Sequence, residues 1–469
     1  MNRRIRRLVQ AWLLGACVLA LGATYYQAIK ADRLATSPGN PRVADVDREI
    51  IRGSILDRDG NVVSGSYAPG LLSRFYNGPG SLAPLIGYAG PSIGKAGLEA
   101  AYDPWLMGRQ PLLNRAGLLW TLAGNRARGY SLGLTISSGV QRACERALAG
   151  RRGAAVVLNA ATGEALAVAS SPWFIPYGAE EMWGFTLSRE DSPLLCRATT
   201  GLYPPGSTIK TAIVAAAIDA GVAGVDEVFQ CSGSIRAGGT VIRDPGGAHG
   251  SVDLKTAVAV SCNVVAVELA LRLGSSLPEA LARYFLDRPA PFDIPTASAR
   301  LGMAKLTQSG DILGQLGIGQ GDLVVTPMHM AMAIAAAVNG GAMMMPYVVR
   351  EIAEPDGHLV RVRRPRELPR PLSPAAAALV TEAMRAAVER GTAVRAGRPG
   401  YDIGGKTGTA QNPHGEPHAW FAGFAVDGSG ERRVAMAIVL ENAGAGGTAA
   451  APLAGDILVT ALDEMEVSG

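Results

Sequence analysis

The sequence has few residues of several kinds, and each scarcity excludes a class of protein. Only 18% of the residues are charged, and a formal net charge of +4 gives no strongly basic surface that would indicate a nucleic-acid partner. The five cysteines show no C-x-x-C spacing and have no histidine pair near them, so the spacing predicts no metal site, and we expect no cofactor. No repeat of 20–50 residues occurs, which excludes solenoid architectures.

The N-terminus contains one long segment without charge. Residues 8–29 exceed the length of about 20 apolar residues that a helix needs to cross a bilayer, so we expect a transmembrane anchor there. Residues 1–7 carry four arginines, and by the positive-inside rule this tail stays in the cytoplasm while the rest of the chain lies outside. A cleaved signal peptide usually has a shorter apolar region. A lipoprotein with a lipidated Cys17 is an alternative that the sequence leaves open.

Four further cysteines follow the anchor: Cys144, Cys196, Cys231 and Cys262. An oxidising compartment would permit disulfides among them, and buried free thiols agree with the sequence equally well. The sequence alone does not pair them.

The pattern after the anchor predicts two regions, a stalk with a small glycine-rich pedestal at residues 30–135 and a larger domain at residues 136–469. In the larger domain, alternating and apolar runs predict a hairpin at 153–171 and strands at 401–410, 418–428 and 431–443. Helices are predicted at 138–149 with Ser138 as N-cap, and at 207–221, 254–274, 326–341 and 373–391. Strands at both ends with helices between them predict an α+β fold, in which N- and C-terminal strands share one antiparallel sheet.

The stretch YPPGSTIKTA places Ser207 and Lys210 on one face at the start of a predicted helix. A serine hydroxyl becomes a good nucleophile when a base takes its proton, but a free lysine has a pKa of about 10.4 and is protonated at neutral pH. Lowering that pKa to about 7 costs on the order of 4–5 kcal/mol, which burial or a second cation can impose. Lys406 in GGKTGTA is the candidate second cation.

Three motifs follow one another in the order STIK at 207–210, SCN at 261–263 and KTGT at 406–409. S-x-x-K, S-D-N and K-T-G are the signature of penicillin-binding proteins and class A β-lactamases. With RGSILDRDG at 52–60 and GKAGLEAAYD at 94–103, the chain resembles a class B penicillin-binding protein of the short form with a small pedestal. The resemblance implies the penicillin-binding/β-lactamase-like transpeptidase fold, an antiparallel sheet flanked by helices.

The resemblance also implies a role for each catalytic candidate. Ser207 would attack the D-Ala-D-Ala carbonyl, with Lys210 as its base. Ser261 would relay a proton to the leaving amine, and Asn263 would orient Lys210. Lys406 would raise the local positive potential.

The same resemblance assigns the substrate-binding groups to the KTGT segment. Thr407, Gly408 and Thr409 would bind the terminal carboxylate of the substrate. The backbone N–H groups of Ser207 and Thr409 would form the oxyanion hole.

The implied activity is that of a monofunctional peptidoglycan D,D-transpeptidase in the bacterial cytoplasmic membrane, with its catalytic domain outside. Its partners would be stem peptides and a membrane glycan polymerase, and β-lactams would inhibit it by acylating Ser207. A D,D-carboxypeptidase or a β-lactamase would carry the same three motifs, but the pedestal and the anchor favour a transpeptidase. A sensor would need a cytoplasmic signalling domain, and a dead scaffold would be expected to have lost Ser207 or Lys406.

Some family-like residues are interpreted as structural. Cys262 replaces the aspartate of S-D-N and is expected to be a small buried residue. Arg52 and Asp57 are expected to pair within the pedestal, with Glu99 as a further structural partner. Two histidines in family-like motifs, His249 and His418, receive the same structural interpretation.

Overall fold

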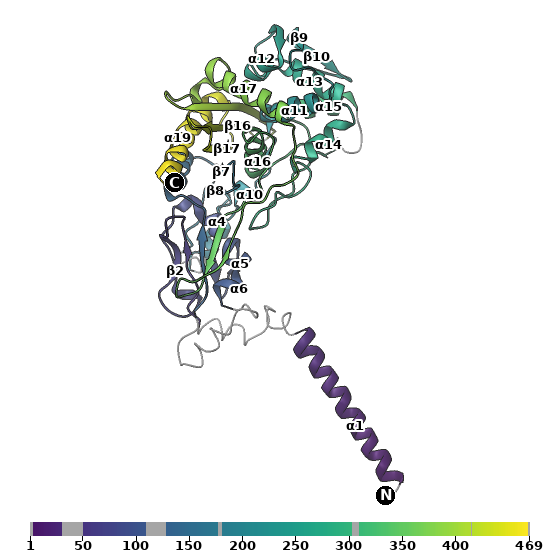
Figure 1. Ribbon diagram of the computed structural model, residues 1–469, viewed down its shortest axis with the longest axis vertical. Helices are drawn as coiled ribbons and strands as arrows, with labels where there is room; N and C mark the ends of the chain where they lie inside the picture. Colours follow the sequence, from purple (N-terminus) through teal and green to yellow (C-terminus); the bar gives the residue numbers. More distant parts are fainter. Residues whose placement is uncertain are drawn as a thin grey trace.

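The computed structural model describes residues 3–30, 50–108, 128–176, 181–302, 309–413 and 415–467. The first helix, α1 (Arg3–Thr24), continues into the π-helical turn η1 (Tyr25–Ile29). The span Arg4–Gln27 has a mean hydropathy of 1.7, is long and apolar enough to cross a membrane, and is not buried against other described residues (Figure 1). Residues 31–49 of the expected stalk lie outside the described residues.

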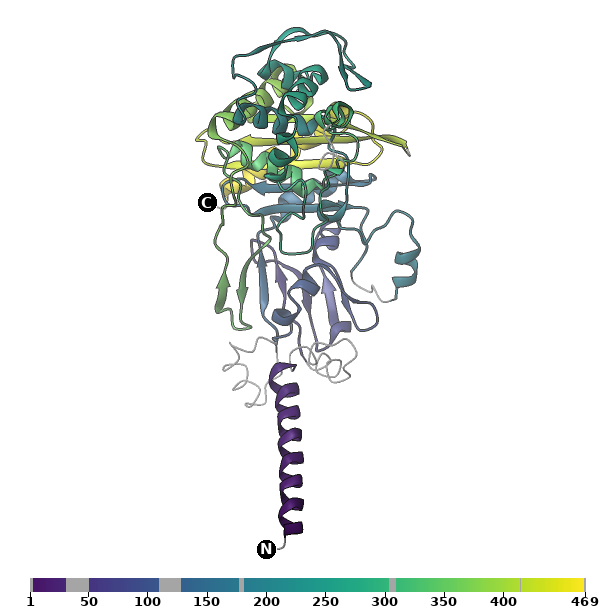
Figure 2. The same cartoon turned by 90° about the vertical axis from the view of Figure 1, so that its right-hand side faces the viewer.

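The pedestal is built on a six-stranded sheet with the strand order β14-β13-β6-β1-β2-β3. Its strands are β1 (Ile55–Leu56), β2 (Val62–Ser66), β3 (Arg74–Tyr76), β6 (Ser131–Leu134), β13 (Val349–Ala353) and β14 (Leu359–Val362). β1 and β6 are parallel, and the other neighbours are antiparallel. The chain thus returns from the larger domain to complete this sheet, and Figure 2 shows the green β13 and β14 beside the purple and blue strands.

Short elements surround this sheet. They are η2 (Leu71–Ser73), η3 (Gly80–Leu82), α4 (Ala83–Ile86), β4 (Ala89–Gly90), β5 (Gly94–Lys95), α5 (Gly97–Ala101) and α6 (Asp103–Leu106). Leu82, Leu85 and Leu98 are fully buried beneath them and join the main hydrophobic core of the molecule.

A buried ion-pair cluster holds the pedestal together. Glu99 Oε2 accepts a hydrogen bond from Arg52 Nε at 2.6 Å, and Glu99 Oε1 forms an ion pair with Arg74 Nη2 at 2.6 Å. Burial alone would raise the pKa of Glu99, but the two guanidinium groups hold that pKa below its usual value. The predicted Arg52–Asp57 pair is therefore wrong, whereas the structural role of Glu99 is confirmed. Asp57 accepts from Ser138 Oγ at 2.6 Å and so links the pedestal to the larger domain.

The larger domain contains a five-stranded antiparallel sheet with the order β15-β16-β17-β7-β8. Its strands are β7 (Gly153–Asn159), β8 (Ala165–Ser171), β15 (Asp402–Asn412), β16 (Gly415–Val426) and β17 (Arg433–Leu440). β7 pairs with β8 as the predicted hairpin, and β17 pairs with β7, so strands from both ends of the domain share one sheet as predicted.

Helices cover both faces of this sheet. On one face pack α8 (Ser138–Leu148) and α19 (Ala451–Val467). On the other lies α16 (Pro327–Val338), with α17 (Pro374–Arg390) beside it, and both begin and end close to their predicted limits. The predicted N-cap of α8 is wrong by one position, because Ser137 accepts from Val140 N and Ser138 is the first helical residue.

Shorter elements complete the larger domain. The helices are α9 (Trp183–Ser188), α10 (Arg197–Thr200), η4 (Gly206–Ile209), α11 (Lys210–Asp219), α14 (Ser276–Ala282), α15 (Gly310–Gly317), η6 (Val394–Ala396) and α18 (Gly446–Ala449). The domain also contains two antiparallel strand pairs: β9 (Val228–Cys231) with β12 (Gly250–Asp253), and β10 (Ser234–Ala237) with β11 (Thr240–Arg243).

The single helix predicted at 254–274 is in fact two helices, α12 (Leu254–Ala259) and α13 (Asn263–Leu273). Ser261 lies between them with φ = 64°, a left-handed conformation that is uncommon for a residue other than glycine. Local periodicity did not reveal the break because the apolar residues continue on both sides of it. The break brings Ser261 and Asn263 next to the start of α11.

Candidate functional site

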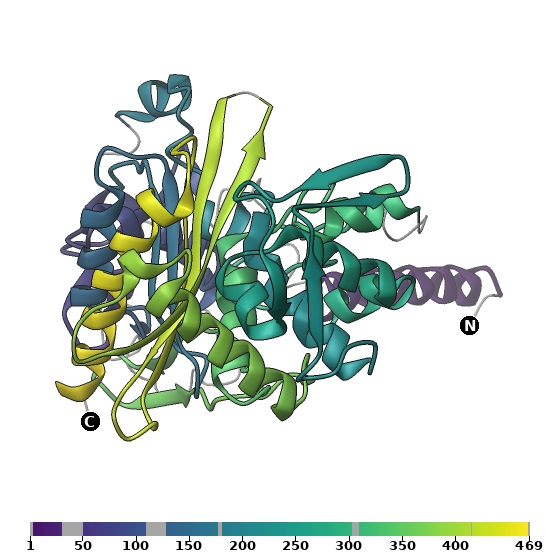
Figure 3. The same ribbon diagram turned by 90° about the horizontal axis from the view of Figure 1, so that it is seen from above.

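Ser207 lies in the short turn η4, immediately before α11, where it lines a cleft of about 890 Å³. The preceding Gly206 has φ = 54°, and a Cβ there would lie 3.0 Å from the carbonyl oxygen of Thr409. Glycine therefore lets the Ser207 turn approach strand β15 closely. Other residues of the cleft come from β15 and from the β11–β12 region, and Figure 3 shows the long β15–β16 hairpin beside the teal strands of this region.

Lys210 is the first residue of α11 and is only 1% exposed. Its Nζ donates to the carbonyl oxygen of Ser261 at 2.6 Å, to Asn263 Oδ1 at 2.6 Å and to Ser261 Oγ at 3.3 Å. Among the described residues, no hydrogen bond joins Lys210 Nζ to Ser207. The two oxygens at 2.6 Å are enough to accept both N–H groups of a neutral amine, which leaves its lone pair free to take a proton.

The two buried lysines have perturbed pKa values. Burial lowers the pKa of Lys210 to about 8, although the negative charge of Asp244 acts in the opposite direction. Burial also lowers the pKa of Lys406 well below its usual value, and the nearby charge of Lys210 lowers it further. Burial, one of the two causes expected from the sequence, lowers the pKa of Lys210, whereas Lys406, the candidate second cation, does not contribute to that lowering.

The KTGT segment lies in β15, the edge strand of the five-stranded sheet, and the η4 turn packs against this strand. Thr407 and Thr409 both line the cleft, and Thr407 Oγ1 donates to Thr392 Oγ1 at 2.9 Å. Gly408 does not line the cleft: a Cβ there would lie 2.9 Å from the carbonyl oxygen of Pro205, so this glycine permits close packing of β15 against the serine turn.

The sequence analysis did not single out Asp244. This buried carboxylate follows β11 and accepts from the backbone N–H of Asn263, and from that of Val264 at 3.3 Å. It thereby fixes the first turn of α13, where Asn263 begins the helix. The D-P-G-G turn was visible in the sequence, but nothing local indicated that its aspartate caps a helix 19 residues later.

His418 has contacts that suit a structural role. Its Nδ1 accepts from the backbone N–H of Asn442 at 3.1 Å, and its ring packs edge-on against Tyr203 at 5.5 Å between centroids. His249 lies in the β11–β12 region and lines the same cleft.

Comparison with known proteins decides the family. Residues 153–459 match the penicillin binding protein transpeptidase domain, and residues 52–132 match the penicillin binding protein A dimerisation domain. The chain belongs to the class B penicillin-binding proteins. The predicted family and fold class are therefore confirmed.

Relatives of this penicillin-binding protein cover nearly its whole length. It is 32% identical to the peptidoglycan D,D-transpeptidase PbpA of Mycolicibacterium smegmatis, over 99% of this chain and 100% of the relative. Penicillin-binding protein A from M. tuberculosis, in its ceftriaxone acyl-enzyme complex, is similar with a TM-score of 0.82 and 31% identity over 89% of this chain and 99% of that one. A D,D-transpeptidase domain from Eggerthella lenta gives a TM-score of 0.79 and 29% identity over 89% of this chain and 100% of that one.

Proposed function

We propose that this class B penicillin-binding protein is a membrane-anchored peptidoglycan D,D-transpeptidase that acts through an acyl-enzyme on Ser207. The observation that carries the proposal is the buried Lys210, whose pKa of about 8 makes a neutral amine accessible near physiological pH. The full-length similarity to proteins named peptidoglycan D,D-transpeptidase supports the same activity.

In the proposed first step, the neutral Lys210 amine takes the proton of Ser207 Oγ as this oxygen attacks the carbonyl carbon of the penultimate D-alanine. The oxyanion that forms is held by the backbone N–H groups of Ser207 and Thr409. A donor of this kind contributes about 3–4 kcal/mol in a serine protease.

The tetrahedral intermediate then collapses and expels the terminal D-alanine. Ser261 Oγ, 3.3 Å from Lys210 Nζ, relays the proton from the lysine to the leaving amine. Asn263 keeps the lysine in position, and the Thr407 and Thr409 hydroxyls bind the substrate carboxylate from the cleft side of β15. An amine of a neighbouring stem peptide attacks the ester carbonyl, the ester bond to Ser207 Oγ breaks, and the proton that the amine loses passes through Lys210 to Ser207 Oγ, which completes the cross-link.

Water could replace the acceptor amine, in which case the same residues would make a carboxypeptidase. The similarity to proteins named peptidoglycan D,D-transpeptidase over nearly the full chain, pedestal included, favours transfer to an amine. We further propose that α1 anchors the chain once in the cytoplasmic membrane with the catalytic domain outside, where a membrane glycan polymerase supplies the strands.

A donor ester that mimics the D-Ala-D-Ala end tests this proposal. The full chain in detergent is incubated with the donor and a D-amino acid as acceptor, and the aminolysis and hydrolysis products are separated by chromatography. We expect aminolysis to exceed hydrolysis at millimolar acceptor, and Ser207→Ala to abolish both products. Hydrolysis alone at every acceptor concentration would identify a carboxypeptidase instead.

A further inference from the structure

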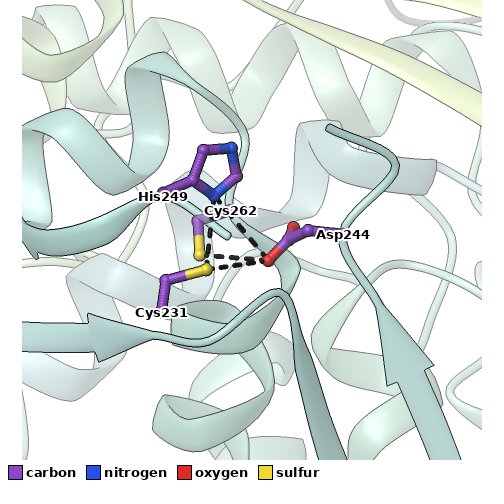
Figure 4. A group of neighbouring side chains, drawn as sticks. All are labelled: Cys231, Asp244, His249 and Cys262. Carbon is purple, nitrogen blue, oxygen red and sulfur yellow. Dashed lines mark hydrogen bonds and ion pairs between the residues drawn. The ribbon is translucent and has the colours of Figure 1, made fainter. Parts of the chain in front are cut away.

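A second group of side chains, distinct from the two lysines, converges behind the SCN turn. It consists of Cys231, Asp244, His249 and Cys262, and Figure 4 shows that the two sulfur atoms, one carboxylate oxygen and one ring nitrogen point toward one another. All four candidate ligand atoms lie within 4.8 Å of one another. We propose that these four side chains bind a structural Zn²⁺ ion.

The distances between the four atoms suit a tetrahedral metal. Asp244 Oδ2 is 3.2 Å from Cys231 Sγ, 3.4 Å from Cys262 Sγ and 3.8 Å from His249 Nδ1. Cys231 Sγ is also 3.3 Å from His249 Nδ1. Zinc bonds of about 2.3 Å to sulfur and 2.0–2.2 Å to nitrogen or oxygen, at tetrahedral angles, place neighbouring ligand atoms roughly 3.3–3.8 Å apart.

The chemistry of the ligand set also indicates zinc. Two thiolates, one imidazole and one carboxylate are all zinc ligands, and thiolates disfavour magnesium and calcium. When the metal binds, the two thiol protons leave to solvent and each sulfur donates an electron pair to the metal. No further protein ligand is needed to reach four coordination.

The fold holds these ligands in place from several directions. Cys231 ends β9 and is paired in register with Gly250, which places the preceding His249 beside it. Asp244 follows β11, and Cys262 occupies the N-cap of α13. Three of the four are buried, at 2% exposed for Cys231, 6% for Asp244 and 1% for Cys262.

Backbone groups provide the outer contacts that metal ligands usually have. The N–H of Val265 donates to Cys262 Sγ at 3.4 Å, a contact that suits a thiolate. The Asp244 carboxylate accepts hydrogen bonds from the backbone N–H groups of Asn263 and Val264, and these contacts fix its orientation.

The sequence spacing did not predict this group because the ligands are separated by 13, 5 and 13 residues and lie in four different segments. The proposal changes the interpretation of Cys262. Its neighbours are Ser261 and Asn263, so a metal bound to Cys262 and Asp244 would hold the SCN turn against Lys210. The two thiols would also be protected from oxidation outside the membrane.

Metal analysis of the full chain, purified in detergent without chelators, tests the proposal. We expect about one zinc per chain by plasma mass spectrometry. Removing even an outer contact of a metal ligand costs roughly 10–100-fold in affinity, so Cys231→Ser and His249→Ala should each weaken zinc binding by more than about tenfold. Cys196→Ser, a buried free thiol outside the group, is the matched control and should retain zinc.

A second measurement uses the wild-type chain alone, so its result does not require any variant to fold. The wild-type chain is stripped with a chelator under reducing conditions and titrated with Co²⁺. One equivalent should produce thiolate-to-cobalt charge-transfer absorption and the intense visible bands of a tetrahedral site. Absence of these bands would overturn the proposal, as would zinc content unchanged in both ligand variants. A Cys231–Cys262 disulfide in the purified protein, detected as two protected thiols on alkylation with no bound zinc, would overturn it as well.

Discussion

Replacing Lys210 with arginine separates the function of this side chain as a base from its positive charge. Burial lowers the pKa of Lys210 to about 8, so the neutral amine should form about 9% of the population at pH 7 and about 91% at pH 9. Because a depressed pKa makes the neutral form available as the pH rises, acylation should increase roughly tenfold over this interval and then level off. Arginine stays protonated in proteins, so Lys210→Arg should lose a general-base contribution of about 10²–10⁴-fold and show no such rise.

The assay measures the second-order rate of acylation by a fluorescent penicillin between pH 6 and pH 10. Lys255→Arg is the matched control, because Lys255 lies on the surface in an ion pair with Glu382 and should not affect the rate. If Lys210 had an ordinary pKa of about 10.4, the wild-type rate would rise about a hundredfold between pH 7 and pH 9 without levelling. Such a profile, or a Lys210→Arg variant with the wild-type rate, would refute the reasoning.

Three further substitutions test separate contacts. Gly206→Ala forces a side chain into a left-handed position 3.0 Å from the carbonyl of Thr409, and should destabilise the fold by about 1–3 kcal/mol and slow acylation; equal stability in denaturant titration would contradict the packing argument. Glu99→Gln removes the carboxylate that pairs with the buried Arg52 and Arg74, leaves Asp103 as the anionic partner of Arg52, and should cost roughly 3–5 kcal/mol of unfolding free energy, with acylation by the folded fraction unchanged. Thr407→Val keeps the side-chain shape but removes the hydroxyl proposed to bind the substrate carboxylate, so acylation by carboxylate-bearing β-lactams should fall about 10–100-fold. A wild-type rate in that variant would remove Thr407 from the binding site.

Local patterns were sufficient to predict much of the larger domain. The β7–β8 hairpin and the helices α16 and α17 were predictable because each is an apolar run bounded by turn or cap residues close in sequence. The sharing of one sheet by the first and last strands followed from the order of the elements.

Features that depend on distant residues were not predictable in the same way. The return of β13 and β14 to the pedestal sheet is a pairing across more than 200 residues. Arg52 pairs with Glu99, 47 positions away, whereas the nearby Asp57 is satisfied within its own turn and by Ser138. In both cases the partner was selected by tertiary packing.

In the candidate site, too, sequence motifs indicated some residues, whereas contacts between distant residues could not be predicted. The order of the three motifs indicated Ser207, Lys210 and Lys406 through the resemblance to the family signature. The sequence did not reveal that the chain breaks its helix at Ser261. It also did not reveal that Asp244 supports the turn that follows, since a carboxylate caps a distant helix only after the chain has folded.

The central claim is that Ser207 forms the acyl-enzyme. Intact-mass spectrometry of the full chain after incubation with benzylpenicillin, beside the Ser207→Ala variant, tests it most directly. The account predicts a gain of one drug mass on the wild-type chain, located by peptide mapping on the Gly206–Ile209 turn, and no adduct on a folded Ser207→Ala variant. An adduct at another residue, or none on folded wild-type protein, would contradict it.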